Sequence, residues 1–109
     1  TVVIALPNHH AYDAHFYQTF WAAYDVPRHL WHFTPDTVEK LLAKHHLKIV
    51  KKTRLPFDAF YISLLSEKYK GSNLFTQYGR AFAVGTTGFL RSLRNPEQSS
   101  SLIYIAKKE

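Results

Sequence analysis

The 109-residue chain contains no cysteine. Disulfides, thiolate nucleophiles and cysteine-based zinc or iron–sulfur sites are therefore excluded. No apolar run approaches the roughly 20 residues that a membrane-spanning helix needs, and the sequence shows no signal-peptide pattern. On these grounds we expect a cytoplasmic protein, with peripheral attachment to a membrane as the variant of that expectation.

Methionine is also absent, and the chain opens directly on an apolar run over residues 1–6. Because natural chains begin with Met and seldom start inside a core strand, we expect residues 1–109 to be the C-terminal part of a longer domain. Glycine is scarce as well. None of the four glycines, at positions 71, 79, 85 and 88, lies between a strand and a following helix, where a glycine-rich cofactor loop belongs.

Acidic residues are few: 8 Asp and Glu face 14 Lys and Arg, and the formal net charge is +6. A basic balance suits polyanions or anionic membrane surfaces. The positive charges are scattered, however, and only residues 48–54 are dense in them. A small basic nucleic-acid-binding module is therefore the alternative function, but no helix-turn-helix, RNP or zinc pattern supports it, and nucleic acid is not the favoured partner.

Hydrophobic residues make up 46% of the chain and aromatic residues 16%, enough to build a core. Residues 1–6 are rich in β-branched side chains and predict a strand buried on both faces. Thr34, Pro35 and Asp36 predict a helix start, with Thr34 as the cap. The other predicted elements are a helix over 13–24 capped by Asp13, a strand from 47, helices over 57–69 and 74–93, the latter breaking near Gly85, and a last strand over 100–107. This alternation indicates an α/β fold.

Several of these segments, taken together, resemble class I S-adenosylmethionine-dependent methyltransferases. They are the strand 1–8, Pro27-Arg28-His29-Leu30 with Phe33-Thr34-Pro35, the helix and strand over 41–52, and the closing strand 100–108. The likeness covers nearly the whole chain and is closest to the ubiquinone-biosynthesis type and the type 11/23 group.

The resemblance implies an α/β fold that is a partial Rossmann-like methyltransferase sheet. It would contain the last three strands, the final one antiparallel between the other two, with helical insertions. S-adenosylmethionine would be the cofactor of the full-length parent, held outside this chain, and the fragment alone would be inactive. Where the family has glycine after the helix, this chain has His46, which is expected to take the left-handed cap conformation at some cost in strain.

Candidate site residues follow from the rule that ligands of open α/β sheets bind beyond the carboxyl ends of the strands. His29 and His32 are the candidate catalytic bases, because an imidazole pKa lies near working pH. For His29 a packing role is the alternative. The expected substrate-binding residues, which would hold a small-molecule or lipid-like methyl acceptor, are Asn8, His10, Tyr12, Tyr24 and Arg28.

Other interpretations of the same region are less favoured. Arg28 could instead pair with Asp25 to hold the loop. His29 and His32 could bind a metal together with His9 or His10, but they lie in a predicted loop without a carboxylate motif, and no metal is expected. His9, His45 and His46 are expected on the surface. The expected partners are the remaining half of the domain and a second copy paired through the exposed edge of the strand 1–6.

Overall fold

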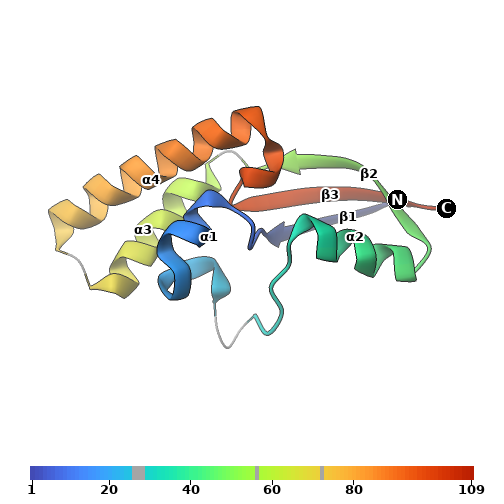
Figure 1. Ribbon diagram of the computed structural model, residues 1–109, viewed down its shortest axis with the longest axis horizontal. Helices are drawn as coiled ribbons and strands as arrows, with labels where there is room; N and C mark the ends of the chain where they lie inside the picture. Colours follow the sequence, from blue (N-terminus) through green and yellow to red (C-terminus); the bar gives the residue numbers. More distant parts are fainter. Residues whose placement is uncertain (26–28, 56, 72) are drawn as a thin grey trace.

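The computed structural model describes residues 1–25, 29–55, 57–71 and 73–109. A three-stranded sheet occupies one end of the molecule and three of the helices gather at the other (Figure 1). This arrangement confirms the predicted α/β class. The elements in chain order are β1 (Val2–Pro7), α1 (Tyr12–Tyr17), η1 (Gln18–Phe20), η2 (Ala22–Tyr24), α2 (Pro35–Lys44), β2 (Leu47–Arg54), α3 (Asp58–Lys70), α4 (Leu74–Arg94), η3 (Pro96–Gln98) and β3 (Ser101–Lys108), where η marks a short 3-10 helix.

The last strand is the central one. The sheet order is β1-β3-β2, and β3 runs antiparallel to both neighbours. Ile4 of β1 pairs with Tyr104, and Ile49 of β2 pairs with Ala106. The two outer strands therefore run parallel to each other, the arrangement that the resemblance implied for a final antiparallel strand.

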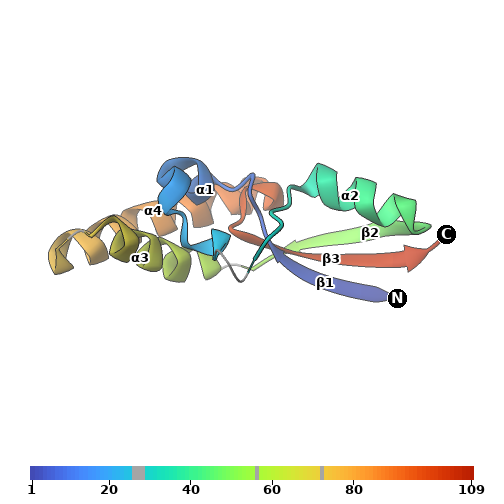
Figure 2. The same ribbon diagram turned by 90° about the horizontal axis from the view of Figure 1, so that it is seen from below.

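One face of the sheet is covered and the other is open. Helix α2 packs on one face, where Val38 and Leu42 join Leu102, Tyr104 and Ala106 in a buried cluster. Figure 2 shows no element of the described chain over the opposite face. At this end of the molecule the core is therefore a two-layer arrangement of α2 on the sheet.

The prediction that the first strand is buried on both faces is wrong for this chain. β1 lies at the sheet edge and pairs only with β3 among the described residues. Its alternate side chains Ile4 and Leu6 pack toward α2, whereas Val3 points to the open face and is 65% exposed. The strand thus has the apolar composition of a strand that is covered on both faces. In the described chain, however, another strand pairs with only one of its edges.

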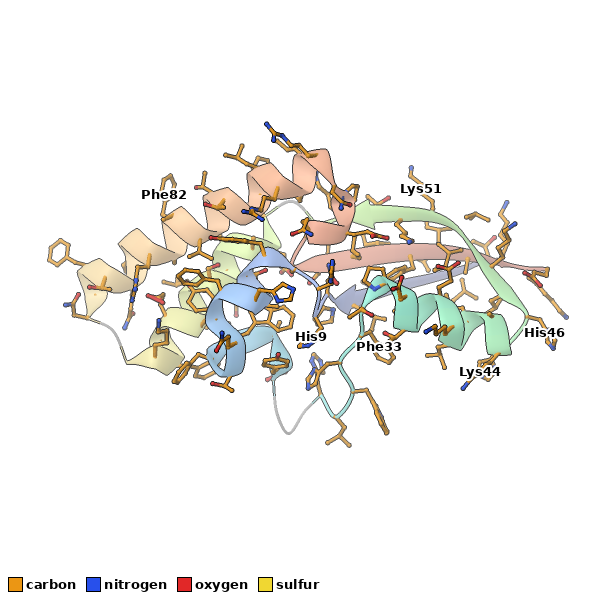
Figure 3. The ribbon with its side chains drawn as sticks, viewed as in Figure 1. His9, Phe33, Lys44, His46, Lys51 and Phe82 are labelled. Carbon is orange, nitrogen blue, oxygen red and sulfur yellow. The ribbon has the colours of Figure 1, made fainter. Side chains whose placement is uncertain are left out.

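Helix α2 begins and ends where the sequence predicted. The Thr34 side chain accepts from the Thr37 amide, the Thr37 hydroxyl accepts from the Thr34 amide, and Pro35 occupies the first turn. The helix ends at Lys44, and His46 takes φ 58°, the left-handed conformation expected for it. The left-handed conformation of His46, although strained, lets the chain reverse directly into β2 (Figure 3).

The helix predicted over 13–24 is wrong in its length. Helix α1 ends at Tyr17, because Gln18 has φ 51°, and two 3-10 turns replace the rest. Asp13 is not the N-cap; that position is Ala11. The Asp13 carboxylate is instead fully buried and accepts hydrogen bonds from Trp21 Nε1 at 2.9 Å and Ser100 Oγ at 2.8 Å. These tertiary contacts override the local capping preference.

Helix α4 runs unbroken through its three glycines, so the predicted break near Gly85 is also wrong. Gly85 lies directly against Phe60 of α3, and Gly88 faces Ala59. Glycine at these positions lets the two helices approach closely. Large apolar residues of the helix, including Phe75 and Phe82, face solvent.

Candidate functional site

The candidate site lies beyond the carboxyl end of β1. Asn8 forms an isolated bridge with Phe33, and the His9 amide donates to the Phe33 carbonyl at 2.8 Å. These contacts fix the segment 29–33 beside the end of the strand. Figure 3 shows His9 and Phe33 side by side at this point. Residues more than twenty positions apart in sequence therefore share one location.

A cavity of about 240 Å³ opens here between the strand end and the segment 29–33. Its wall is mostly apolar and includes the imidazole rings of His9, His29 and His32. Leu30 and Trp31 are largely exposed and form part of its wall. The lining residues are Leu6, Pro7, His9, Trp21, His29, Leu30, Trp31, His32 and Phe33.

Tyr24 connects the imidazoles behind the cavity. Its hydroxyl lies 3.1 Å from His9 Nδ1, and its ring meets His32 edge-on with 4.8 Å between centroids. The Trp21 ring contacts the Tyr24 ring on another side, with 5.1 Å between their centroids, and Trp21 Nε1 donates a hydrogen bond to the buried Asp13. The Tyr24 phenol is therefore held in place by ring contacts on two sides and by one hydrogen bond.

The environment favours the neutral forms of His32 and Tyr24. Burial, followed by the nearby His9 and His29, lowers the pKa of His32 below its usual 6.5. Burial raises the pKa of Tyr24 above 10.0. At neutral pH His32 is an unprotonated imidazole, which can accept a proton, while Tyr24 keeps its proton and can donate a hydrogen bond. The arrangement thus combines a largely apolar cavity wall with a neutral imidazole that can accept a proton.

Of the seven predicted site residues, His29 and His32 line this cavity, and Tyr24 lies behind it in contact with the His32 ring. His29 Nδ1 lies 3.5 Å from the Ala23 carbonyl oxygen, so His29 also makes a structural contact. Arg28 lies outside the described residues, and so does any pairing of it with Asp25.

The other three predicted residues lie apart from the cavity. Asn8 is buried, and its Nδ2 donates to the carbonyls of Glu97 and Ser99 at 2.6 and 2.8 Å. The His10 ring lies against His15, with 5.8 Å between centroids. Tyr12 packs under the Arg91 guanidinium at 4.6 Å, on the α4 side of the molecule.

His9 and Trp21 line the cavity, although neither was among the predicted catalytic or substrate-binding residues. His9 is exposed, as expected, but it is also a cavity wall and the partner of Tyr24. The available signal was its place one residue after Asn8, where a strand end meets a ligand crevice. Its neighbour His10 occupies the same kind of position and points elsewhere, so position alone did not separate them.

Within the described ranges no group of three His, Asp or Glu side chains is arranged to bind a metal ion. Among the same residues, no helix combines the length and apolar content that crossing a bilayer requires. No protein-family model, curated protein or solved structure matches the chain. The assignment of function therefore depends on the sheet and the site themselves.

Proposed function

We propose that this chain is the substrate-side part of an S-adenosylmethionine-dependent methyltransferase domain. The observation that carries the proposal is the strand order: the last strand lies antiparallel between two strands that run parallel to each other. This is the arrangement that the resemblance to class I methyltransferases implies for the end of their sheet. The histidine cavity lies beyond the carboxyl end of β1, where ligands of such sheets bind.

The described residues do not fit the cofactor itself. Gly71 caps the end of α3, and Gly79, Gly85 and Gly88 lie inside α4, so none follows a strand and opens a helix. A glycine-rich phosphate or nucleoside loop cannot be built from them. The proposal therefore places S-adenosylmethionine on a part of the protein outside this chain.

The chain's own residues would receive the methyl acceptor. Leu30, Trp31 and Phe33 offer apolar walls for a small-molecule or lipid-like acceptor. Methyl transfer commonly requires that the acceptor lose a proton to a base, and His32 is held neutral for that role. His29 is the second candidate base, since it lines the same cavity.

The open edge of β1 and the bare face beside it provide the place for the rest of the domain. Val3 projects from this face, and Ile103 and Ile105 lie opposite β1 on the same side of β3. An unpaired apolar edge of this kind is a template for a further strand. The same edge supports the alternative that two copies of the chain pair there.

Calorimetry with S-adenosylhomocysteine tests the proposal. The complete protein that contains residues 1–109 is expected to bind it, and residues 1–109 alone are expected not to. The gene upstream should encode a strand, a glycine-rich turn and a helix. A complete protein that lacks this unit and gives no binding heat would remove the basis of the proposal.

The acceptor site needs a separate measurement. Methyl transfer from labelled S-adenosylmethionine should fall about 10²–10⁴-fold in His32→Gln, the range of general-base contributions. His45→Gln is the matched control, because His45 is exposed at the end of α2, away from the cavity. Equal activity in the two variants would show that His32 is not the base.

A basic nucleic-acid-binding module is the second candidate, and one observation favours it. Lys48 and Lys107 are paired directly across β2 and β3, with Lys108 opposite Leu47 in the next position. Like charges placed opposite each other are destabilising unless an anion lies between them. Salt-dependent binding of generic DNA or RNA, weakened in Lys48→Gln, would support this candidate over the methyltransferase.

A further inference from the structure

Asp13 is a buried carboxylate that contacts the wall of the histidine cavity from behind. Its side chain is fully buried, and Oδ2 accepts hydrogen bonds from Trp21 Nε1 at 2.9 Å and from Ser100 Oγ at 2.8 Å. Within the described residues Oδ1 has no hydrogen-bond partner and the carboxylate forms no ion pair. Burial raises the pKa of Asp13 above its usual 3.8. None of the roles proposed for the cavity above involves this group.

The stability of the fold does not by itself account for a carboxylate at this position. Taking a charged or polar group out of water is costly unless its polar atoms find partners, and Oδ1 of Asp13 finds none in the described chain. Buried titratable groups of this kind gather at functional sites. The Asp13 carboxylate supplies a fixed acceptor for one donor. Because an indole ring has a single N–H, the bond to that N–H sets the orientation of the ring.

Trp21 connects this carboxylate to the imidazoles. Its side chain is 2% exposed and lines the cavity. The ring meets Tyr24 edge-on with 5.1 Å between centroids, and its centroid lies 6.4 Å from that of His9. Tyr24 in turn has its ring against His32 and its hydroxyl 3.1 Å from His9 Nδ1. The position of the indole therefore limits where Tyr24 can lie, and Tyr24 limits His9 and His32.

We propose that Asp13 is a positioning residue of the histidine cavity: its hydrogen bond holds the Trp21 indole, and the indole holds Tyr24, His9 and His32 in the arrangement that receives a ligand. Asp13 does not line the cavity itself, so it acts through Trp21 and not on the ligand. The consequence for methyl transfer rests on the proposed function, whereas the arrangement of the rings does not.

Titration of His32 by NMR tests the proposal without reference to methyl transfer. In the complete protein with 13C-labelled histidine, the His32 signal is the one that is absent from His32→Gln. Burial, followed by His9 and His29, holds the pKa of His32 below 6.5. In Asp13→Ala, which removes the acceptor of the indole, this pKa should rise toward 6.5 because the rings around His32 enclose it less closely. Loss of a negative charge alone would lower the pKa, so a rise reports on the position of the rings.

Two variants make the reading specific. Asp13→Asn keeps a carbonyl acceptor for Trp21 Nε1 and should keep the His32 pKa of the wild type. Ser100→Ala is the matched control, because it removes the other hydrogen bond to Asp13 Oδ2 and Ser100 does not line the cavity. It should lower Tm, as the loss of a buried hydrogen bond does, and leave the His32 pKa unchanged. If Asp13→Ala does not fold, Trp21→Phe replaces it, since it removes the indole N–H and leaves Asp13 in place.

An unchanged His32 pKa in Asp13→Ala, or in Trp21→Phe where that variant stands in, would overturn the proposal. An equal rise in Ser100→Ala would do the same, because Asp13 would then only stabilise the fold. Where the complete protein transfers methyl groups, kcat should fall about 10-fold to 10²-fold in Asp13→Ala and recover in Asp13→Asn. A complete protein that transfers none refutes the proposed function, and the His32 titration still decides the role of Asp13.

Discussion

Two glycines in the same helix should respond in opposite directions to the same substitution. Gly79 and Gly85 both lie inside α4, six residues apart. A Cβ added at Gly79 meets nothing within 4 Å. A Cβ added at Gly85 would lie 2.6 Å from Phe60 Cδ1 and 3.0 Å from Phe60 Cα. Because one of these atoms belongs to the backbone of α3, a rotation of the Phe60 ring cannot remove the whole overlap.

The magnitudes follow from two opposing effects. Alanine is favoured over glycine in a helix interior by up to about 1 kcal/mol, so Gly79→Ala should raise the free energy of unfolding by about 0.5–1 kcal/mol. Overpacking a well-filled contact costs about 1–3 kcal/mol. Gly85→Ala gains the same helix preference and suffers the overpacking, so its unfolding free energy should fall below that of Gly79→Ala by about 1–3 kcal/mol.

Urea unfolding followed by far-UV circular dichroism measures the difference, and thermal unfolding provides a second reading. For a domain of about 100 residues, 1 kcal/mol corresponds to roughly 4–8 °C in Tm. The two variants should therefore differ by at least about 4 °C, with Gly79→Ala above the wild type. Equal stabilisation in both would refute the close packing of α3 on α4 at Phe60, and with it the account of why α4 buries only small residues.

Three further predictions concern single side chains just after β1, in α1 and in the turn after α2. Asn8→Ala removes two buried hydrogen bonds, to Glu97 and Ser99, and should lower the free energy of unfolding by about 2–4 kcal/mol in urea titrations; a loss below 0.5 kcal/mol would contradict the buried amide. Burial raises the pKa of Asp13, so its contribution to stability is fully present below pH 3.8 and is lost as pH rises through the higher folded-state pKa. The Tm of Asp13→Asn relative to wild type should accordingly increase with pH above about 4, and a constant difference would be inconsistent with the raised pKa. His46→Gly relieves a left-handed conformation and should add about 0.5–1 kcal/mol by urea unfolding, whereas a loss of stability would mean that the His46 side chain makes stabilising contacts.

Features that depend on a few adjacent residues could be predicted from the sequence. The cap at Thr34, the proline in the first helical turn and the left-handed His46 all depend on local backbone geometry and short-range hydrogen bonds. The end of α3 at Gly71, which has φ 75°, is of the same kind. Such signals determine where an element begins and ends, without reference to what it packs against.

The side on which an element packs could not be predicted in the same way. Phe75, Tyr78 and Phe82 recur at helical spacing, and a stripe of large apolar residues normally faces the core. In α4 the buried side consists instead of small residues, because α3 approaches closely along Gly85. Spacing in the sequence indicates that two sides of a helix differ in composition. It does not indicate which side packs against another element.

The candidate site was predicted in part for a related reason. His29 and His32 share one short segment, and their residue type made them candidates. His9 joins them only because Phe33 bridges to Asn8, and that contact brings together residues 25 positions apart. Asp13 shows the reverse effect: a good local N-cap residue is withdrawn into the interior by Trp21 and Ser100. Long-range partners decide both outcomes.

The open sheet edge and the histidine cavity belong to the same strand, and this links the two parts of the proposed function. β1 pairs only with β3 in the described chain, and His9 follows two residues after its end. A strand that joined β1 on its free side would hydrogen-bond the backbone that leads into Asn8 and His9, and so restrict the movement of the cavity wall. The proposed role of His32 as a base requires its position to be fixed relative to the acceptor, because small displacements of a base reduce its contribution strongly. The proposed methyltransferase therefore requires its remaining half for the geometry of the acceptor site as well as for the cofactor.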